Sequence, residues 1–296
     1  MRAASLPRQA ALASVDLRAS RCQVLGILNV TPDSFSDGGR FHEIERAVER
    51  GRWLVEHGAD LVDVGGESTR PGAARIDEDE ELRRVLPVVA ELSAAGIAVS
   101  IDTMRARVAA AAVDAGAVLV NDVSGGLSDP AMLPFVASAQ MPCILMHWRG
   151  YSATMQQLAV YGDVVEDVRV ELSRRVDAAL AAGIRLDWIV LDPGLGFAKE
   201  STHNWQLLAG LPRLRDLGLP LLVGASRKRF LADCVTYDGA DDAQPSGRDD
   251  ASSAVAALAA ANGVWGVRVH EPAAAAAAVR VADAVRRQAL RSVGEP

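Results

Sequence analysis

The chain has 296 residues, 50% of them hydrophobic, and its formal net charge is −7 at pH 7. This length is enough to bury a large core, and the negative charge gives nucleic-acid binding no electrostatic support. No apolar stretch has the length of a membrane span, and the three cysteines include no CxxC pair. These features argue against a membrane protein, a disulfide framework and a zinc module, and they favour a globular protein of the reducing cytoplasm.

Eight short apolar runs alternate with helical segments along the chain. Each run stops at a polar or Gly-rich cluster, which is typical of buried parallel strands. Strands that alternate with helices over about 250 residues predict an α/β fold, a single (β/α)8 TIM barrel. The runs cover residues 24–28, 61–64, 98–101, 118–120, 143–146, 188–191, 221–223 and 264–269.

The segments between the runs predict helices, several of which stop at Gly or Asn. The Ala-rich stretch from Pro272 has high helix propensity and a proline near its start. We see no internal repeat and no interdomain linker, so residues 22–296 are assigned to one barrel domain and residues 1–21 to a poorly ordered tail. Residues 233–249 are expected to form a solvated insertion. The expected helices cover residues 44–57, 79–95, 105–115, 163–182 and 252–261.

Polar side chains follow the apolar runs. In a (β/α)8 barrel the C-terminal ends of the strands form one face, where the chemistry is located. The polar strand ends should therefore converge on one mouth, which predicts an enzyme. An anionic substrate would need local positive charge in this acidic chain. Basic side chains at predicted strand ends supply it: Arg70, Arg227, Lys228, Arg229, Arg268 and His270.

Two polar loops follow the first two runs. The first begins at Asn29, whose amide oxygen could bind a hard cation such as Mg²⁺ that is shared with a phosphate. The second contains Arg70, whose guanidinium can bind phosphate or carboxylate through two hydrogen bonds. A capped loop rich in turn-forming residues and a turn with a solvated arginine remain the alternative interpretations.

Asp102, Asn121 and Asp192 each close an apolar run. Two carboxylates and an amide in one pocket suit a heterocycle rich in N–H groups, because a carboxylate accepts hydrogen bonds from amino groups of such a ring. The alternative is that strand-end aspartates cap the helices that follow them. His147 ends the fifth run, and we expect hydrogen bonds to hold it rather than a catalytic role.

The last two strand ends carry basic residues. Lys228 lies in a Gly-Ala-Ser-Arg-Lys-Arg segment after the seventh run, where many barrels bind phosphate. Arg268 and His270 are two residues apart on the eighth strand, so they should point to the same side and could bind an oxyanion together. A solvated strand end is the alternative.

Eight motifs, in order, closely resemble those of the dihydropteroate synthase family: NVTPDSFSDGG, DVGGESTRPGA, SIDTMR, VNDVSGG, LMHW, LDPGLGFAK, GASRKRFL and VRVH. The resemblance extends from about Val24 to the last helix. It implies a (β/α)8 barrel that joins 6-hydroxymethyl-7,8-dihydropterin diphosphate to 4-aminobenzoate. The products would be 7,8-dihydropteroate and diphosphate, in a folate-biosynthesis step that sulfonamides inhibit.

The resemblance also implies residue roles, a Mg²⁺ cofactor and a cytoplasmic homodimer. Asn29 would bind Mg²⁺ and diphosphate. The pterin would contact Asp102, Asn121, Asp192 and Lys228, with Met146 and Gly224 nearby. The diphosphate would contact Arg70, Arg268 and His270. The aminobenzoate pocket would comprise Thr69, Pro71, Phe197, Lys228 and Arg229. Catalysis would depend on Asp102, Asp192, Lys228, Arg268 and His270.

Two other functions are compatible with a pterin-binding barrel. A pterin-binding methyltransferase would share the Asp and Asn set but would not need the Asn29 loop or the pair formed by Arg268 and His270. A non-catalytic paralogue would have a damaged diphosphate or aminobenzoate site. All of the motif positions are intact here, which favours the synthase.

Overall fold

Eight parallel strands form a barrel in the computed structural model, which describes residues 15–31, 39–70, 72–235 and 245–293. The strand order is β6-β5-β4-β3-β2-β1-β8-β7, and a parallel bridge between Leu191 and Leu221 joins the two ends of this sheet. The predicted (β/α)8 barrel is confirmed. The strands are β1 (Gln23–Asn29), β2 (Leu61–Gly65), β3 (Val99–Asp102), β4 (Leu119–Asp122), β5 (Cys143–Met146), β6 (Ile189–Asp192), β7 (Leu222–Val223) and β8 (Gly266–Val269).

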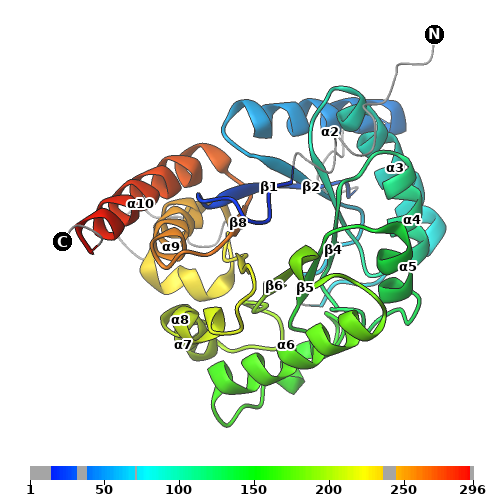
Figure 1. The fold of residues 1–296 in the computed structure, drawn as a ribbon. Coiled ribbons are helices and arrows are strands. Elements are labelled where there is room, and N and C mark those ends of the chain that lie inside the picture. Colours follow the sequence, from blue (N-terminus) through cyan, green and yellow to red (C-terminus); the bar gives the residue numbers. More distant parts are fainter. Residues whose placement is uncertain (1–14, 32–38, 71, 236–244, 294–296) are drawn as a thin grey trace.

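The helices form an outer ring around the strands (Figure 1). They are α2 (Gly39–Glu56), α3 (Glu78–Ala94), α4 (Ala106–Asp114), α5 (Met132–Ala139), α6 (Val164–Ala181), α7 (Ser201–Ala209), α8 (Leu211–Arg215), α9 (Asp249–Ala261) and α10 (Pro272–Val293). In the described part of the chain the connections contain four 3₁₀ segments: η2 (Met155–Leu158), η3 (Leu186–Trp188), η4 (Arg229–Cys234) and η5 (Pro245–Arg248). The helices expected from the sequence are present, with ends shifted by a few residues. None of the helices in the described ranges is long and apolar enough to cross a membrane.

Aspartate residues cap the N-termini of two helices, as the acidic residues at these positions in the sequence suggest. Asp77 precedes α3 and accepts a hydrogen bond from the Glu80 amide at 2.7 Å. Asp163 precedes α6 and accepts from the amides of Val165 and Glu166. Each carboxylate satisfies amide groups that have no partner within the helix and lies at the positive end of the helix dipole.

The alternation along each strand separates two cores. On β3, for example, Val99 and Ile101 pack outward in the core between barrel and helices, so Ser100 and Asp102 point into the barrel. A second, smaller core fills the barrel interior at the N-terminal ends of the strands. It comprises Leu25, Leu61, Val118, Leu119, Ile144, Val190, Leu222, Trp265 and Val15. Apolar residues thus close the bottom of the barrel, and polar residues are left to line its top.

Residues 15–21 differ from the poorly ordered tail expected for residues 1–21. Val15 is buried in the interior core, and the Trp265 indole nitrogen donates to the Asp16 carbonyl at 3.0 Å. Arg21 donates to the Asp60 carboxylate from two guanidinium nitrogens. This segment packs at the bottom of the barrel because the strand starts leave apolar surface there. Residues 1–14 lie outside the described residues.

We expect Leu25→Ala to lower the free energy of unfolding by about 2–5 kcal/mol, because the side chain is fully buried inside the barrel and leaves a cavity. Urea denaturation measures the change. Val281→Ala is the control, since Val281 is 66% exposed on α10 and should change stability by at most about 0.5 kcal/mol. Equal small effects for both variants would contradict a packed interior layer.

Candidate active site

Inward-facing residues at the C-terminal ends of the strands form the site. The same alternation that puts Leu25 and Leu61 at the bottom puts Asn29 and Asp63 higher on β1 and β2. On β8, Val267 and Val269 pack outward, so Arg268 and His270 face the barrel mouth together, as predicted. The other inward strand ends carry Asp102, Asn121, Met146, Asp192 and Gly224.

Arg268 lies at the centre of the site between two carboxylates. Its Nε donates to Asp63 Oδ2 at 2.6 Å, and its Nη2 donates to Asp102 Oδ2 at 2.6 Å. Asn121 Nδ2 also donates to Asp63 Oδ2, at 3.0 Å. These bonds join β8, β2, β3 and β4, and they place Asp102 and Asn121 in one pocket, as the sequence predicted.

Burial changes the proton affinity of this cluster. Burial of Asp102, with Asp63, Glu81 and Asp122 near, raises the pKa of Asp102 to about 7, although Arg268 opposes the shift. Burial acts to lower the pKa of Arg268, but Asp63 and Asp102 outweigh it and raise that pKa. Arg268 therefore stays charged, and Asp102 can exchange a proton near neutral pH when a ligand changes its surroundings.

A second carboxylate faces Lys228 on the other side of the barrel. Asp192 Oδ1 accepts from the Gly194 amide at 2.7 Å, and the Lys228 amine donates to the Leu195 carbonyl. Burial lowers the pKa of Lys228 to about 8, while Asp192 opposes the shift. The Lys228 nitrogen also lies 4.9 Å from the centre of the Phe197 ring. Lys228 can thus contact both a ligand at Asp192 and one at Phe197.

The wall between these two groups is apolar. Met146 is buried in a cluster with Met104 and Val123, against which Phe197 packs. Gly224 forms part of the floor, since a methyl group added there would lie 3.8 Å from Asp192 Oδ2 and 3.9 Å from the Lys228 nitrogen. A flat ring can therefore lie against Met146 and Gly224 with its edge toward the carboxylates.

Positive side chains surround the rim. His270 Nδ1 lies 3.0 Å from Ser226 Oγ, and the same hydroxyl oxygen accepts from the His270 amide. Burial, then the charges of Arg227, Arg268, Arg70 and Lys228, lower the pKa of His270 to about 3. The exposed Arg70 is thus close enough to His270 to act on it electrostatically. The rim suits a highly charged anion that would bring negative charge to these groups.

The segment after β7 is held in a strained conformation. Arg227 has φ +59°, which is uncommon for a residue other than glycine. Its guanidinium donates to both oxygens of Asp249 at 2.7 and 2.8 Å, and its carbonyl accepts from Arg248. The end of the expected solvated insertion therefore supports the Lys228 segment. Arg229 begins η4 with an exposed side chain, and residues 236–244 lie outside the described residues.

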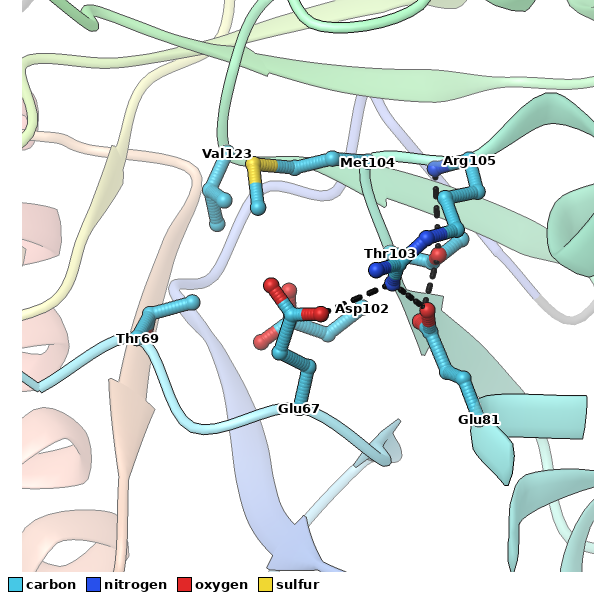
Figure 2. A pocket seen from close by; sticks show the side chains of 8 residues that line it. All are labelled: Glu67, Thr69, Glu81, Asp102, Thr103, Met104, Arg105 and Val123. Atoms are coloured by element: carbon cyan, nitrogen blue, oxygen red, sulfur yellow. Dashed lines mark hydrogen bonds and ion pairs between the residues drawn. The ribbon is translucent and has the colours of Figure 1, made fainter. Parts of the chain in front are cut away.

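A small pocket beside Asp102 is closed by an ion-pair cluster (Figure 2). Arg105 pairs with Glu67 at 2.8 Å and with Glu81, while Thr103 Oγ1 donates to Glu81 at 2.6 Å. Arg105 also donates to the Ile76 carbonyl. Both ends of the loop after β2 are thus bound to one guanidinium, and this anchors the segment that carries Thr69.

Of three further predicted residues, Asn29 and Thr69 lie at the mouth of the barrel and Pro71 is outside the described residues. Asn29 is half-buried at the end of β1, and its side-chain amide has no protein hydrogen-bond partner among the described residues. Thr69 is half-buried, and its carbonyl accepts from Ser152. Pro71 lies outside the described residues, as do residues 32–38 of the first loop.

Some functional candidates were not found from the sequence. Asp63 was missed, although a lone carboxylate inside an apolar strand run was a visible signal. No pattern in the sequence indicated that Glu67 pairs with Arg105. His147 matches its expectation: it is buried, its Nε2 lies 2.9 Å from Glu171 and its Nδ1 lies 2.9 Å from the Lys199 amine. Burial, followed by the charge of Lys199, lowers the pKa of His147 to about 4, so the ring is neutral at pH 7.

Comparison with known proteins gives consistent matches. The chain matches the sequence family described as pterin binding enzyme over residues 25–270. The dihydropteroate synthase of Mycobacterium leprae is 55% identical over 265 residues, which cover 88% of this chain and 93% of that protein. A Xanthomonas albilineans dihydropteroate synthase structure with 4-aminobenzoic acid is 44% identical, with a TM-score of 0.81 and coverage of 93% and 94% of the two chains. Another structure from that organism, in complex with 7,8-dihydropteroate, has a TM-score of 0.80 at 41% identity and covers 95% of this chain and 97% of that one.

In the free protein, His270 should stay neutral between about pH 8 and pH 5, because burial and the surrounding cations oppose its protonation. The folded-state pKa is depressed, so the stability that this histidine contributes is present above its unfolded value near 6.5 and is lost as pH falls toward about 3. NMR titration of ¹⁵N-labelled histidines, with His270→Gln for assignment, measures the midpoint. Added inorganic diphosphate should raise it, and a midpoint near 6.5 in the free protein would contradict this electrostatic picture.

Proposed function

The chain belongs to the dihydropteroate synthase family of pterin-binding enzymes, and we propose that its site carries out the family's reaction by a dissociative substitution. The enzyme is a transferase that condenses 6-hydroxymethyl-7,8-dihydropterin diphosphate with 4-aminobenzoate, giving 7,8-dihydropteroate and diphosphate. One observation supports the assignment of roles. Asp102, Asn121 and Asp192 all lie at inward positions at the C-terminal ends of their strands. Arg268 is bonded to Asp102, the charge of Lys228 acts on Asp192, and His270 lies at the rim.

The pterin ring fits the inner part of this pocket. Its amino and N–H groups can donate to the Asp102 and Asp192 carboxylates, while the Asn121 amide supplies both a donor and an acceptor. The buried Asp63 Oδ1 has no hydrogen-bond partner within the described residues, so a ligand rich in N–H groups would add the missing donor. Met146 and Gly224 provide the flat apolar contact for the ring faces.

The chemical step follows from these charges. The bond between the C6 methylene and the diphosphate oxygen breaks, and its electron pair leaves with diphosphate. The electron-rich ring stabilises the positive charge on the methylene, and Asp102 and Asp192 lower the energy of this cationic state. The 4-aminobenzoate nitrogen then forms the new bond and loses a proton to solvent. No strong protein base is needed, because an aromatic amine is already neutral at pH 7.

Two groups of residues at the mouth would bind the diphosphate and the 4-aminobenzoate. Arg70 and His270 at the rim would bind the diphosphate, and His270 would gain a proton as negative charge grows on the leaving group. Thr69, Pro71, Phe197 and Arg229 would form the aminobenzoate pocket with Lys228. The proposal gives Arg268 a second task beyond the diphosphate contact, because its bonds to Asp63 and Asp102 also orient the ring pocket.

We propose Mg²⁺ as the cofactor, bound through Asn29 and the substrate diphosphate. Within the described residues no group of three or more His, Cys, Asp or Glu side chains could hold a metal ion. Asn29 offers one amide oxygen at the mouth, which fits an ion that keeps most of its water and binds mainly through phosphate oxygens. When bound, Mg²⁺ would neutralise part of the charge of the leaving diphosphate.

We also propose a homodimer in the cytoplasm, on the basis of the family resemblance. The compartment is supported by the cysteines, since Cys22, Cys143 and Cys234 are all free thiols and two of them are buried.

We expect the purified enzyme to form dihydropteroate and diphosphate in equal amounts from the two substrates. Arg268→Met should weaken binding of the bare pterin by about tenfold or more, because it removes the hydrogen bond that orients Asp102. Its turnover should fall as well. Calorimetry with bare pterin and a product assay measure these effects.

His270→Gln is the contrasting variant for this experiment. It should weaken binding of diphosphate and of pterin diphosphate but leave bare pterin affinity unchanged, because His270 lies at the rim. If bare-pterin affinity is unchanged in Arg268→Met, Arg268 does not contribute to the ring pocket and its role is limited to the diphosphate.

We expect Asn29→Ala to raise the Mg²⁺ concentration for half-maximal activity by about tenfold, because it removes the amide oxygen proposed as a ligand. Calorimetry should show that Mg²⁺ no longer strengthens diphosphate binding. Asn29→Asp keeps an oxygen at this position and should retain the Mg²⁺ response. If Asn29→Ala responds to Mg²⁺ as the unmodified enzyme does, the ion is not bound at Asn29.

A further inference from the structure

Lysine is rare in this chain and is found at only two positions, of which Lys199 is buried and Lys228 is half-buried. Lys199 and Lys228 are the only lysines among 31 lysines and arginines, so every other basic position carries arginine. Lys228 already has a place in the mechanism. Lys199 has none, although its exposed fraction is only 3%. The lysine side chain brings to this buried position a compact amine that arginine lacks.

The Lys199 amine connects the loop after β6 to the end of β5. Its nitrogen lies 3.0 Å from the Phe197 carbonyl oxygen and 2.9 Å from His147 Nδ1. Two N–H groups serve both contacts, so the contacts form whether the amine is charged or neutral. Because the amine donates to Nδ1, the His147 proton lies on Nε2 and is donated to Glu171 at 2.9 Å.

The loop that Lys199 holds is strained and tightly packed. Ala198 has φ +49° with a fully buried side chain, and its carbonyl accepts from the Tyr161 hydroxyl at 2.9 Å. Gly194 of the same loop lies so close to β5 that a methyl group there would meet the His147 carbonyl oxygen at 2.4 Å. Such a conformation persists only where surrounding contacts hold it, and the Lys199 amine supplies two of them.

Phe197 is the residue through which this support reaches the substrate. Its carbonyl is bound by Lys199, its amide donates to the Gly194 carbonyl, and its ring lies 4.9 Å from the Lys228 nitrogen. The backbone bond to Lys199 therefore sets the position of the ring that faces Lys228.

We propose that Lys199 is a positioning residue for 4-aminobenzoate, acting through its bonds to Phe197 and His147 to hold the Phe197 ring against the arylamine. The inference rests on the proposed function of Phe197 in the aminobenzoate pocket. The hydrogen bonds of the Lys199 amine go to Phe197 and His147 and not to a residue of the proposed pterin pocket. Its charge also acts on Asp192 and Lys228, so the second substrate is where its positioning effect should be largest.

The test is Lys199→Met, which keeps the length of the side chain and removes the donor. The KM for 4-aminobenzoate should rise by about tenfold or more, as expected for losing hydrogen bonds to a positioned group. Sulfonamide binding to the enzyme with pterin and diphosphate should weaken by a similar factor. Affinity for bare pterin, measured by calorimetry, should stay within about twofold.

Arg149→Met is the matched control. Arg149 is a cation of the same cluster and binds Glu171 and the carbonyls of Leu158 and Val160. It reaches the Phe197 loop only by stacking on Tyr161 and donates none of these hydrogen bonds to that loop. Its KM for 4-aminobenzoate should be unchanged. If Arg149→Met reproduces the effect of Lys199→Met, the cluster acts through its charge or stability, and the positioning role is overturned.

A double-mutant cycle with Phe197→Ala separates this inference from the function on which it rests. If Lys199 acts through Phe197, Lys199→Met should add no further loss in the Phe197→Ala background. An unchanged KM in Phe197→Ala alone would refute the aminobenzoate pocket. A normal effect of Phe197→Ala with no effect of Lys199→Met would refute only the role of Lys199.

A measurement on the unmodified enzyme covers the case in which Lys199→Met does not fold. Labelling with ¹⁵N-lysine gives only two side-chain nitrogen signals, one for each lysine. The Lys199 signal should shift more when a sulfonamide binds in the presence of diphosphate than when bare pterin binds. A Lys199 signal that ignores the sulfonamide would overturn the proposal.

Discussion

The pairing of Arg268 with Asp63 and Asp102 is the constraint on which the mouth of the barrel depends. Three charged groups lie on inward positions of β8, β2 and β3, where each would be costly to bury alone. Their bonds of 2.6 Å compensate one another and fix the orientation of the Asp102 carboxylate. Removing Arg268 would leave two buried carboxylates without their cation, so binding geometry and local stability are coupled at this point.

This arrangement also explains how an acidic protein can accept a highly charged substrate. The net charge of −7 is distributed over the whole chain, whereas cations gather at one rim. Burial and then these cations depress the pKa of His270, so its ring is neutral in the free protein. A diphosphate bound at this rim would reverse that balance. Binding of diphosphate would then be coupled to protonation of His270, a coupling that a permanently charged side chain does not have.

Two loops carry residues of the proposed aminobenzoate pocket, and each is held by one basic side chain. Arg105 binds both ends of the loop after β2 through Glu67 and the Ile76 carbonyl. Lys199 holds the loop after β6 through Phe197. The ends of these loops are therefore fixed to the barrel, and the residues that face the substrate lie on short segments between fixed points. This reduces the conformational entropy that substrate binding must remove.

The sequence by itself determined the fold and most of the site. Apolar runs with helices between them specify a (β/α)8 barrel, and alternation with a period of two put Arg268 and His270 on one side of β8. These conclusions depend on local pattern, which a linear sequence displays. The tertiary structure alone decided which charges pair. Arg268 meets Asp63 and Asp102 from positions 205 and 166 residues away, and Arg105 meets Glu67 in the same way. The burial of Val15 beneath the barrel was likewise decided only in three dimensions. No local spacing encodes such contacts, because the register and closure of the barrel bring distant side chains within hydrogen-bonding distance.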